Sequence, residues 1–162
     1  MTQIQPQPLP AGFPEELVES NLFLLKRLGM AAKGISLDRY EELGLHPYHH
    51  AILAVLDEGS RDTQGAIADA LGYDKGQLVG LLDELEELEL IERQRDPNDR
   101  RRQKVHMTPA GRKMLDRLRR LSVRLENEFL APLSERERQE LHQLLLRLGE
   151  EHLPNCTPPA RG

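Results

Sequence analysis

Residues 63–111 read TQGAIADALG, then YDKGQLVGLLDELEELEL, then IERQRDPNDRRRQKVHMTPAG, and this stretch decides the fold. Its first segment predicts a short helix that ends at Gly72, with apolar residues at helical spacing: Ala66, Ile67, Ala70 and Leu71. Asp74 can cap a second helix, with Gln77 three residues on to return the bond as in a capping box. The expected buried stripe of that helix is Leu78, Leu81, Leu82, Leu85 and Leu88. Two helices joined by a short glycine-containing turn are typical of a helix-turn-helix, whose second helix can enter the DNA major groove.

A predicted β-hairpin follows the second helix. Residues 91–95 and 103–107 flank a turn rich in Pro, Asn and Asp. The hairpin carries six basic residues, namely Arg93, Arg95, Arg100, Arg101, Arg102 and Lys104, against the acids Glu92, Asp96 and Asp99. A basic hairpin beside a helix-turn-helix is typical of a winged helix, and its arginines suit phosphates or a narrow minor groove.

Composition narrows the class of protein. The chain has 162 residues with 4% aromatics and no Trp, and helical apolar periods dominate, so we expect a mainly α protein. We find no secretory signal pattern and no apolar run near the ~18 residues of a membrane span, so we expect a cytoplasmic protein. The lone cysteine, Cys156, excludes an internal disulfide and a CxxC motif. The net charge of −5 and pI of about 5.7 disfavour a generic nucleic-acid binder, but local charge decides a phosphate contact.

The chain order predicts five segments: a flexible arm (1–12), N-terminal dimerisation and pocket helices (13–46), the winged helix-turn-helix (47–108), C-terminal dimerisation helices (109–153) and a loose tail (154–162). In the second segment we expect one helix from Phe13 to about Lys33 and a short helix from Ser36 to Gly44. The winged helix begins with a helix from Pro47 to Gly59.

Two more helices are predicted after the hairpin. Thr108 and Pro109 start a long helix to about Leu130, and Ser134 caps a last helix whose Leu141, Leu144, Leu145 and Leu148 should face inward. The first and last helices have apolar stripes outside the winged helix, which predicts a two-fold homodimer built from both chain ends. The alternative is a monomer in which these helices pack on the winged helix.

Several spaced motifs make the chain resemble the MarR family of bacterial transcriptional regulators. Asp96–Arg102 followed by Met107–Gly111 is similar to the family's D-x-R wing and L-T-x-x-G pattern, with Met for Leu. Residues 63–72 resemble the first helix of the motif, and Asp83, Leu85, Glu86 and Leu90–Arg93 resemble the second helix and its exit. The resemblance covers about residues 15–153.

The resemblance implies a triangular homodimer that represses nearby genes and releases DNA on binding a small phenolic or lipophilic molecule. Carried onto this sequence, Arg101 enters the minor groove and Asp99 holds its guanidinium. The residues implied to meet the major groove are Lys75, Gly76, Gln77 and Val79. Thr63 and Gln64 offer contacts to phosphate near a helix N-terminus.

Four features depart from the family pattern. Gly76 and Gly80 stand where Ser and a polar or basic residue are frequent, and each glycine costs a helix ~1 kcal/mol relative to Ala. Glu89 occupies a position where Gly often closes the helix, so its backbone must strain or end differently. No cysteine lies near the first helix, which excludes the thiol mechanism of the peroxide-sensing branch.

A candidate effector site is predicted from position in the sequence. A hydroxyl, an imidazole and a guanidinium around apolar walls could orient an aromatic acid, and the candidates are Arg39, Tyr40, Tyr48, His49 and His50. His46 with His49 or His50 has ligand-compatible spacing, but zinc needs three or four converging ligands, so we predict no metal and no cofactor.

The sequence favours a non-enzyme, since it has no G-x-S-x-G, P-loop, H-E-x-x-H or Rossmann glycine pattern. We expect a homodimeric repressor on a pseudo-palindromic duplex DNA operator, released by a small aromatic or lipophilic effector, with no membrane contact. The alternatives are a winged-helix protein-interaction module and a metal-sensing regulator.

Overall fold

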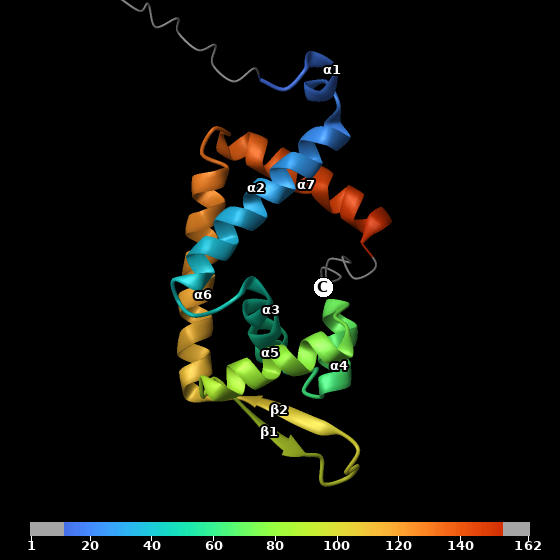
Figure 1. Cartoon of the computed structure of the whole chain (residues 1–162), viewed down its shortest axis with the longest axis vertical. Coiled ribbons are helices and arrows are strands. Elements are labelled where there is room, and N and C mark those ends of the chain that lie inside the picture. The colour runs from blue at the N-terminus through green and yellow to red at the C-terminus, as the bar shows by residue number, and fades with distance from the viewer. Residues whose placement is uncertain (1–11, 154–162) are drawn as a thin grey trace, which may run out of the picture.

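A computed structural model describes residues 12–153 of the chain. The elements along this part of the chain are α1 (Glu15–Val18), α2 (Asn21–Glu41), α3 (Pro47–Glu58), α4 (Gln64–Leu71), α5 (Lys75–Glu87), β1 (Ile91–Arg95), β2 (Gln103–Met107), α6 (Pro109–Phe129) and α7 (Glu135–His152). Helix α6 runs along one side of the molecule and connects a lower lobe of α3, α4, α5 and the hairpin to an upper layer where α2 crosses α7 (Figure 1). The predicted mainly α winged-helix fold is confirmed. The predicted arm lies outside the described residues except for Gly12, and the tail with Cys156 lies outside them entirely.

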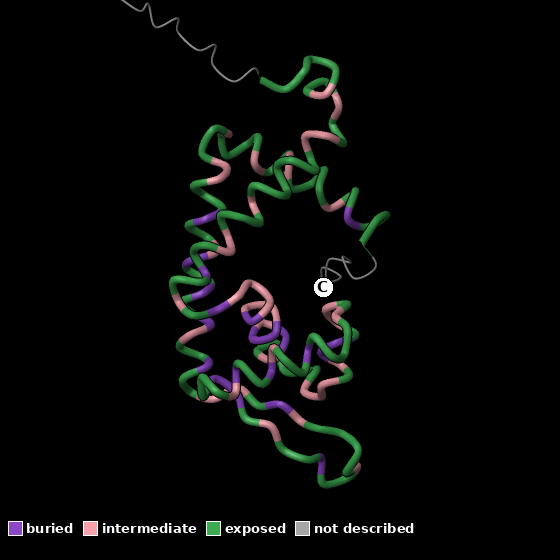
Figure 2. Tube along the Cα trace, viewed as in Figure 1, coloured by how far each residue is buried: buried purple, intermediate pink, exposed green. Residues whose placement is uncertain are grey.

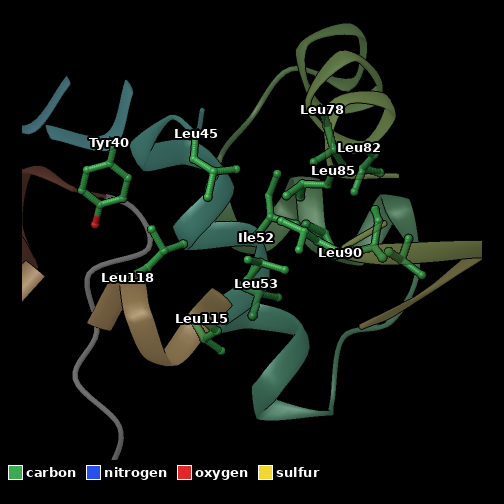
Figure 3. Close-up of a cluster of buried hydrophobic side chains, with 14 of the residues drawn as sticks. Tyr40, Leu45, Ile52, Leu53, Leu78, Leu82, Leu85, Leu90, Leu115 and Leu118 are labelled. Atoms are coloured by element: carbon green, nitrogen blue, oxygen red, sulfur yellow. The ribbon is translucent and has the colours of Figure 1, made fainter. Parts of the chain in front are cut away.

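The core lies in the lower lobe, where α3 is surrounded by α4, α5, α6 and the hairpin. Ile52 and Leu53 of α3 are fully buried at its centre, and side chains from α5 and α6 converge on them (Figure 3). The stripe of α5 that faces α3 is Leu78, Leu82 and Leu85. Burying each such side chain stabilises the fold by roughly 1.5–3 kcal/mol. The predicted stripe ends at Leu85, because Leu88 is the C-cap of α5 and is 46% exposed.

The helix-turn-helix forms as its sequence predicts. Gly72 ends α4 with a left-handed φ of 65°, and Asp74 caps α5 by accepting the backbone N–H groups of Gly76 (2.9 Å) and Gln77 (3.2 Å). The predicted return bond from the Gln77 side chain is absent, so α5 has a simple N-cap and no capping box.

Strands β1 and β2 pair antiparallel with Ile91 opposite Met107, over the predicted ranges. At the base of this hairpin, the Thr108 N–H donates to the Leu90 carbonyl (3.0 Å) and the Thr108 hydroxyl donates to the Glu89 carbonyl (2.7 Å). Gly111, in the first turn of α6, packs against the same backbone, and an added Cβ there would collide with the Leu90 carbonyl. Glycine at this position is therefore a packing requirement.

The upper helices differ from prediction. The expected breaks after Lys33 and before Ser36 are wrong, because α2 runs unbroken through both positions. The Ser36 hydroxyl donates to the Ala32 carbonyl (2.8 Å) inside the helix and caps nothing. The expected start at Phe13 is also wrong, since α1 is a separate turn and Ser20 caps α2 by accepting the Phe23 N–H. No proline occurs from residue 21 to 41, so nothing forces the predicted stop.

The apolar faces of α2 and α7 are largely exposed in the single chain. Leu144 is 54% exposed, and Leu22, Leu25, Leu28, Leu145, Leu148 and Leu153 are exposed too. The upper layer is correspondingly coloured as exposed over most of its length (Figure 2). The expectation that the α7 leucines face inward is therefore wrong within one subunit for Leu144, Leu145 and Leu148, whereas Leu141 is half-buried. Among the described helices, none combines the length and apolar character that crossing a bilayer requires.

Glu89 is the only non-glycine residue with positive φ among residues 12–153, at 57°. Such a backbone costs an L-residue about 1–2 kcal/mol, so Glu89→Gly is expected to raise the free energy of unfolding by about 1 kcal/mol after the entropic cost of glycine. Urea denaturation measures this change. Glu87→Gly, at a helical position two residues earlier, should lower the free energy by about 0.5–1 kcal/mol. Loss of stability in Glu89→Gly would contradict the assignment of strain.

Candidate DNA-binding site

A cleft of about 680 Å³ lies between the start of α4, the start of α5 and the hairpin. It brings together six residues that the sequence singles out for DNA contact: Thr63, Gln64, Lys75, Val79, Arg101 and Arg102. The fold thus places Thr63 and Gln64 on the same surface as Arg101 and Arg102, which follow them by more than thirty residues in the sequence. The cleft also contains Asp69 and Gln103, which the sequence reasoning missed because neither belongs to a basic run.

The start of α4 is tied to the hairpin. Thr63 caps the helix by accepting the Ala66 N–H (3.2 Å) and pairs with Lys104 in an isolated β-bridge. The Asp62 carbonyl accepts the Val105 N–H (2.7 Å), and the Asp62 carboxylate lies 3.4 Å from Lys104 Nζ. Lys104 is thereby drawn towards Asp62, while the strand pairing fixes the hairpin relative to α4.

The exposed side of α5 presents Lys75, Gly76, Gln77 and Val79 above its buried leucines. Because the Gln77 side chain takes no part in the cap, it is available for an adenine edge, the pairing that glutamine favours. A Cβ at Gly80 would meet nothing, so that glycine has no packing reason.

The tip of the hairpin is built by two aspartates that accept backbone N–H groups. Buried Asp96 accepts the Asn98 N–H (2.9 Å), and Asp99 accepts the Arg101 N–H (3.0 Å). Asp99 was expected to hold the Arg101 guanidinium. Instead it binds the Arg101 backbone, and its second oxygen lies 3.6 Å from Arg102 Nε. An Asp two residues before an N–H readily closes such a turn, so Asp99 shapes the tip and the Arg101 side chain is left exposed.

Arg93 is not brought to this surface. Its guanidinium donates to Glu86 Oε2 (2.6 and 3.0 Å) and to Asp83 Oδ1 (2.6 Å), and its side chain is only 18% exposed. The Glu86 carboxylate also accepts the Arg93 backbone N–H (3.1 Å). These bonds lower the pKa of Glu86 and raise that of Arg93. Arg93 therefore fastens β1 to α5, and we leave it out of the proposed interface. Arg95 and Arg100 stay exposed.

The five candidate effector residues do not form one site. Tyr40 lines a cavity of about 610 Å³, walled by Leu25, Leu28, Ile35, Leu125, Phe129 and Leu145 among others, with Ser36, Ser122 and Glu126 as its further polar residues. The sequence reasoning missed Ser36 and Ser122, because helical serines carry no local signal of a cavity. The Tyr40 hydroxyl lies 2.7 Å from His50 Nδ1. Burial raises the pKa of Tyr40, so the phenol is uncharged at neutral pH.

The other candidates are engaged elsewhere. Arg39 lies 3.6 Å from Glu128 of α6, and the Tyr48 ring packs on Tyr73 with centroids 5.0 Å apart. His49 is 2% exposed, and its Nε2 lies 2.8 Å from Glu84 Oε2 of α5. Among the residues that the structure describes, no guanidinium lines the cavity. Within residues 12–153, no three His, Cys, Asp or Glu side chains converge as metal ligands would.

Arg93→Ala is expected to lower the free energy of unfolding by about 1–2 kcal/mol, since the three hydrogen bonds from the Arg93 side chain to α5 are lost. The salt dependence of duplex DNA binding should stay at its wild-type slope, because no phosphate contact is removed. Arg95→Ala, an exposed control in the same strand, should change stability by less than about 0.5 kcal/mol. Wild-type stability with a reduced salt slope in Arg93→Ala would show that Arg93 contacts DNA.

Buried His49 and half-buried His50 predict a loss of stability in mild acid. Burial lowers the pKa of His49 and, together with Arg119, that of His50 below the ordinary 6.5. Below about pH 6.5 the unfolded chain binds protons that the folded chain does not, so the free energy of unfolding should fall as the pH falls. The lowered pKa of Glu86 removes stability only from about pH 4.5 downwards.

Urea denaturation at about pH 7.5 and 5.5 measures this loss. His49→Gln keeps an acceptor for the cap of α3 without a titrating ring, so it should flatten the pH dependence. A stability that is constant between these two pH values would contradict the prediction.

Comparison with known proteins agrees with this geometry. The family model described as "MarR family" matches residues 43–102. A relative from Thauera aromatica, whose name describes a transcriptional regulatory protein for the hcr operon, is 38% identical over 105 residues. That match covers 65% of this chain and 63% of the relative, so the chain spans less than two thirds of the relative's length.

Solved structures extend the likeness over most of the chain. A probable transcriptional regulator from Pseudomonas aeruginosa is 30% identical, with a TM-score of 0.72 over 82% of this chain and 98% of that one. A MarR-family regulator from Rhodococcus sp. RHA1 is 26% identical, with a TM-score of 0.71 over 83% and 96%.

Two structures at 23% identity share the fold alone. They are S. aureus MepR in a DNA complex (TM-score 0.70, over 82% of this chain and 98% of that one) and Rhodococcus jostii RHA1 CouR bound to p-coumaroyl-CoA (TM-score 0.71, over 90% and 100%). From the matched family model, the winged helix and the likeness to the Pseudomonas aeruginosa and Rhodococcus sp. RHA1 regulators, we conclude that the chain belongs to the MarR family of winged helix-turn-helix transcriptional regulators.

Proposed function

We propose that this chain is a cytoplasmic, sequence-specific DNA-binding repressor that acts as a homodimer and is released by a small lipophilic effector. The observation that carries the proposal is the cleft that sets Lys75 of α5 beside Arg101 and Arg102 of the hairpin tip. This pairing matches a helix that reads base edges next to an arginine that enters an adjoining minor groove. MepR, which shares the fold, has been crystallised on DNA.

The exposed leucines of α2 and α7 support a dimer. A contiguous apolar surface of this kind is rare on a monomer and is normally covered by another chain. A two-fold axis through these helices would present two copies of α5 to half-sites roughly 34 Å apart. The operator would then be a pseudo-palindrome that mirrors the protein's symmetry.

The cavity beside Tyr40 supports an effector site between the upper helices and the winged helix. Apart from Glu126, its polar residues are the uncharged Ser36, Tyr40 and Ser122, and its walls are apolar. These groups suit a lipophilic molecule with one hydrogen-bonding group better than the aromatic acid that the sequence suggested, because a buried carboxylate would lack a cationic partner. CouR, which shares the fold, has been crystallised with bound p-coumaroyl-CoA.

Release would follow from a population shift. An effector that favours a spacing or tilt of the two α5 helices that no longer matches the half-sites needs a coupling of about 1–3 kcal/mol. Tyr40 belongs to α2, and its hydroxyl reaches His50 of α3, so a cavity occupant would contact a residue joined to the winged helix.

A winged-helix protein-interaction module is the second candidate, favoured by the acids on α5 and the net charge of −5. Two of those acids are occupied by Arg93, which reduces the repulsion that DNA would meet. Selection of duplexes from genomic DNA at low salt separates the two functions, since an interaction module would enrich no site.

Arg101→Ala is expected to weaken binding to all duplex sequences and to reduce the slope of log affinity against log salt by about 1, because one phosphate-region contact is lost. Fluorescence anisotropy over a series of salt concentrations measures both effects. The matched control is Arg120→Ala, an exposed arginine on α6 away from the cleft, which should change neither. Unchanged affinity in Arg101→Ala would reject the proposed docking of the hairpin tip.

A further inference from the structure

We infer that His49 of α3 is a positioning residue for the recognition helix α5 and acts through Glu84. This inference rests on the proposed DNA binding. The two side chains meet between helices that are separated by α4 in the sequence, and His49 Nε2 lies 2.8 Å from Glu84 Oε2. His49 is almost fully buried, whereas the Glu84 side chain is 61% exposed and could extend into solvent.

The local structure of α3 fixes which His49 nitrogen faces Glu84. His49 Nδ1 accepts the backbone N–H of His46 (3.0 Å), and His46 Nδ1 in turn accepts the Tyr48 N–H (3.1 Å). A ring that accepts at Nδ1 carries its proton at Nε2 in the neutral form. The Nε2–H group therefore faces a carboxylate oxygen at 2.8 Å, but the N–H direction lies outside hydrogen-bond geometry, so Nε2 makes no hydrogen bond and the attraction is that of the carboxylate charge for the N–H dipole.

The position of Glu84 makes this contact relevant to DNA recognition. Helix α5 contains Gly76 and Gly80, and each weakens a helix by ~1 kcal/mol relative to Ala. Arg93 holds α5 from the hairpin side through Asp83 and Glu86, and His49 holds it from the α3 side through Glu84.

The contacts of Arg93 and His49 therefore fall on the same turn of α5. The fully buried Leu82 and Leu85 pack that turn against the core. A helix fixed from two sides keeps Lys75 and Gln77 in register with base edges at its far end. Asp83, Glu84 and Glu86 are then anchors, which explains why a DNA-facing helix carries these three acids.

Removing Glu84 tests this role, because charge and positioning predict opposite effects. Glu84→Ala deletes a negative charge from α5, which by itself should strengthen binding to DNA, but it also frees α5 from His49. We expect affinity for a selected duplex to fall about five- to tenfold, which corresponds to roughly 1–1.4 kcal/mol. Affinity for a scrambled duplex should be unchanged or slightly tighter, so the specificity ratio falls.

The probes are a duplex that the wild-type protein selects from a random library and a scrambled duplex of the same composition, measured by fluorescence anisotropy. Glu84→Gln keeps a partially negative oxygen opposite His49 Nε2–H and should lose less affinity than Glu84→Ala. Glu87→Ala removes the same charge from α5 at an exposed position where the structure shows no ion pair, so it should not weaken binding.

Hydrogen exchange of residues 75–87 in the free protein adds a readout that needs no DNA. We expect faster exchange in Glu84→Ala, by about fivefold, and wild-type exchange in Glu84→Gln and Glu87→Ala. Wild-type affinity in Glu84→Ala, or an equal loss in Glu84→Gln, would overturn the positioning role. Failure of the wild-type protein to select any duplex would instead overturn the proposed function.

Discussion

The fold depends on one backbone junction at the base of the hairpin. The carbonyls of Glu89 and Leu90 accept, respectively, the hydroxyl and the N–H of Thr108, and the Thr108 hydroxyl oxygen accepts the Gly111 N–H (3.0 Å). The junction connects α5, which ends just before it, to the two strands at the base of the hairpin and to α6, which begins just after it. The left-handed backbone of Glu89 and the missing Cβ of Gly111 are the geometric conditions for it. The orientation of the recognition helix relative to the hairpin follows from this junction.

The local distribution of charge, more than the net charge, decides whether this molecule can contact DNA. The chain is acidic overall, yet the cleft gathers Lys75, Arg101 and Arg102 on one surface. On α5, three of the acids that make the helix look unsuited to DNA have basic or imidazole partners, which are Arg93 for Asp83 and Glu86, and His49 for Glu84. Exposed charges further apart than about 10 Å are largely screened at physiological salt, so the net charge decides less than these contacts.

The two halves of the molecule are stabilised differently. The lower lobe buries its own core around Ile52 and Leu53, whereas α2 and α7 leave leucines in solvent. Helix α6 belongs to both, since Leu115 and Leu118 are buried in the lower core and Phe129 lines the cavity above. A change in the packing of the upper helices would therefore reach the winged helix through α6 and through the Tyr40–His50 contact.

The sequence by itself determined the elements with local signals. Caps at Asp74, Thr108 and Ser134, glycine stops at Gly59 and Gly72, and the hairpin limits all follow from short-range backbone chemistry, and the structure confirms them. The same local rules failed at Ser36, where a good capping residue lies inside a helix that nothing interrupts.

Only the tertiary structure decided how side chains are used. Arg93 and Arg95 look alike in the sequence, but packing places acids from α5 beside the first and leaves the second exposed. The candidate effector residues separate into different contacts for the same reason, and Ser122 joins the cavity from a helix more than eighty residues further along the chain than Tyr40. A hydrophobic period specifies which face of a helix is buried but not which residue lies opposite, because that partner is set by the packing of the whole core.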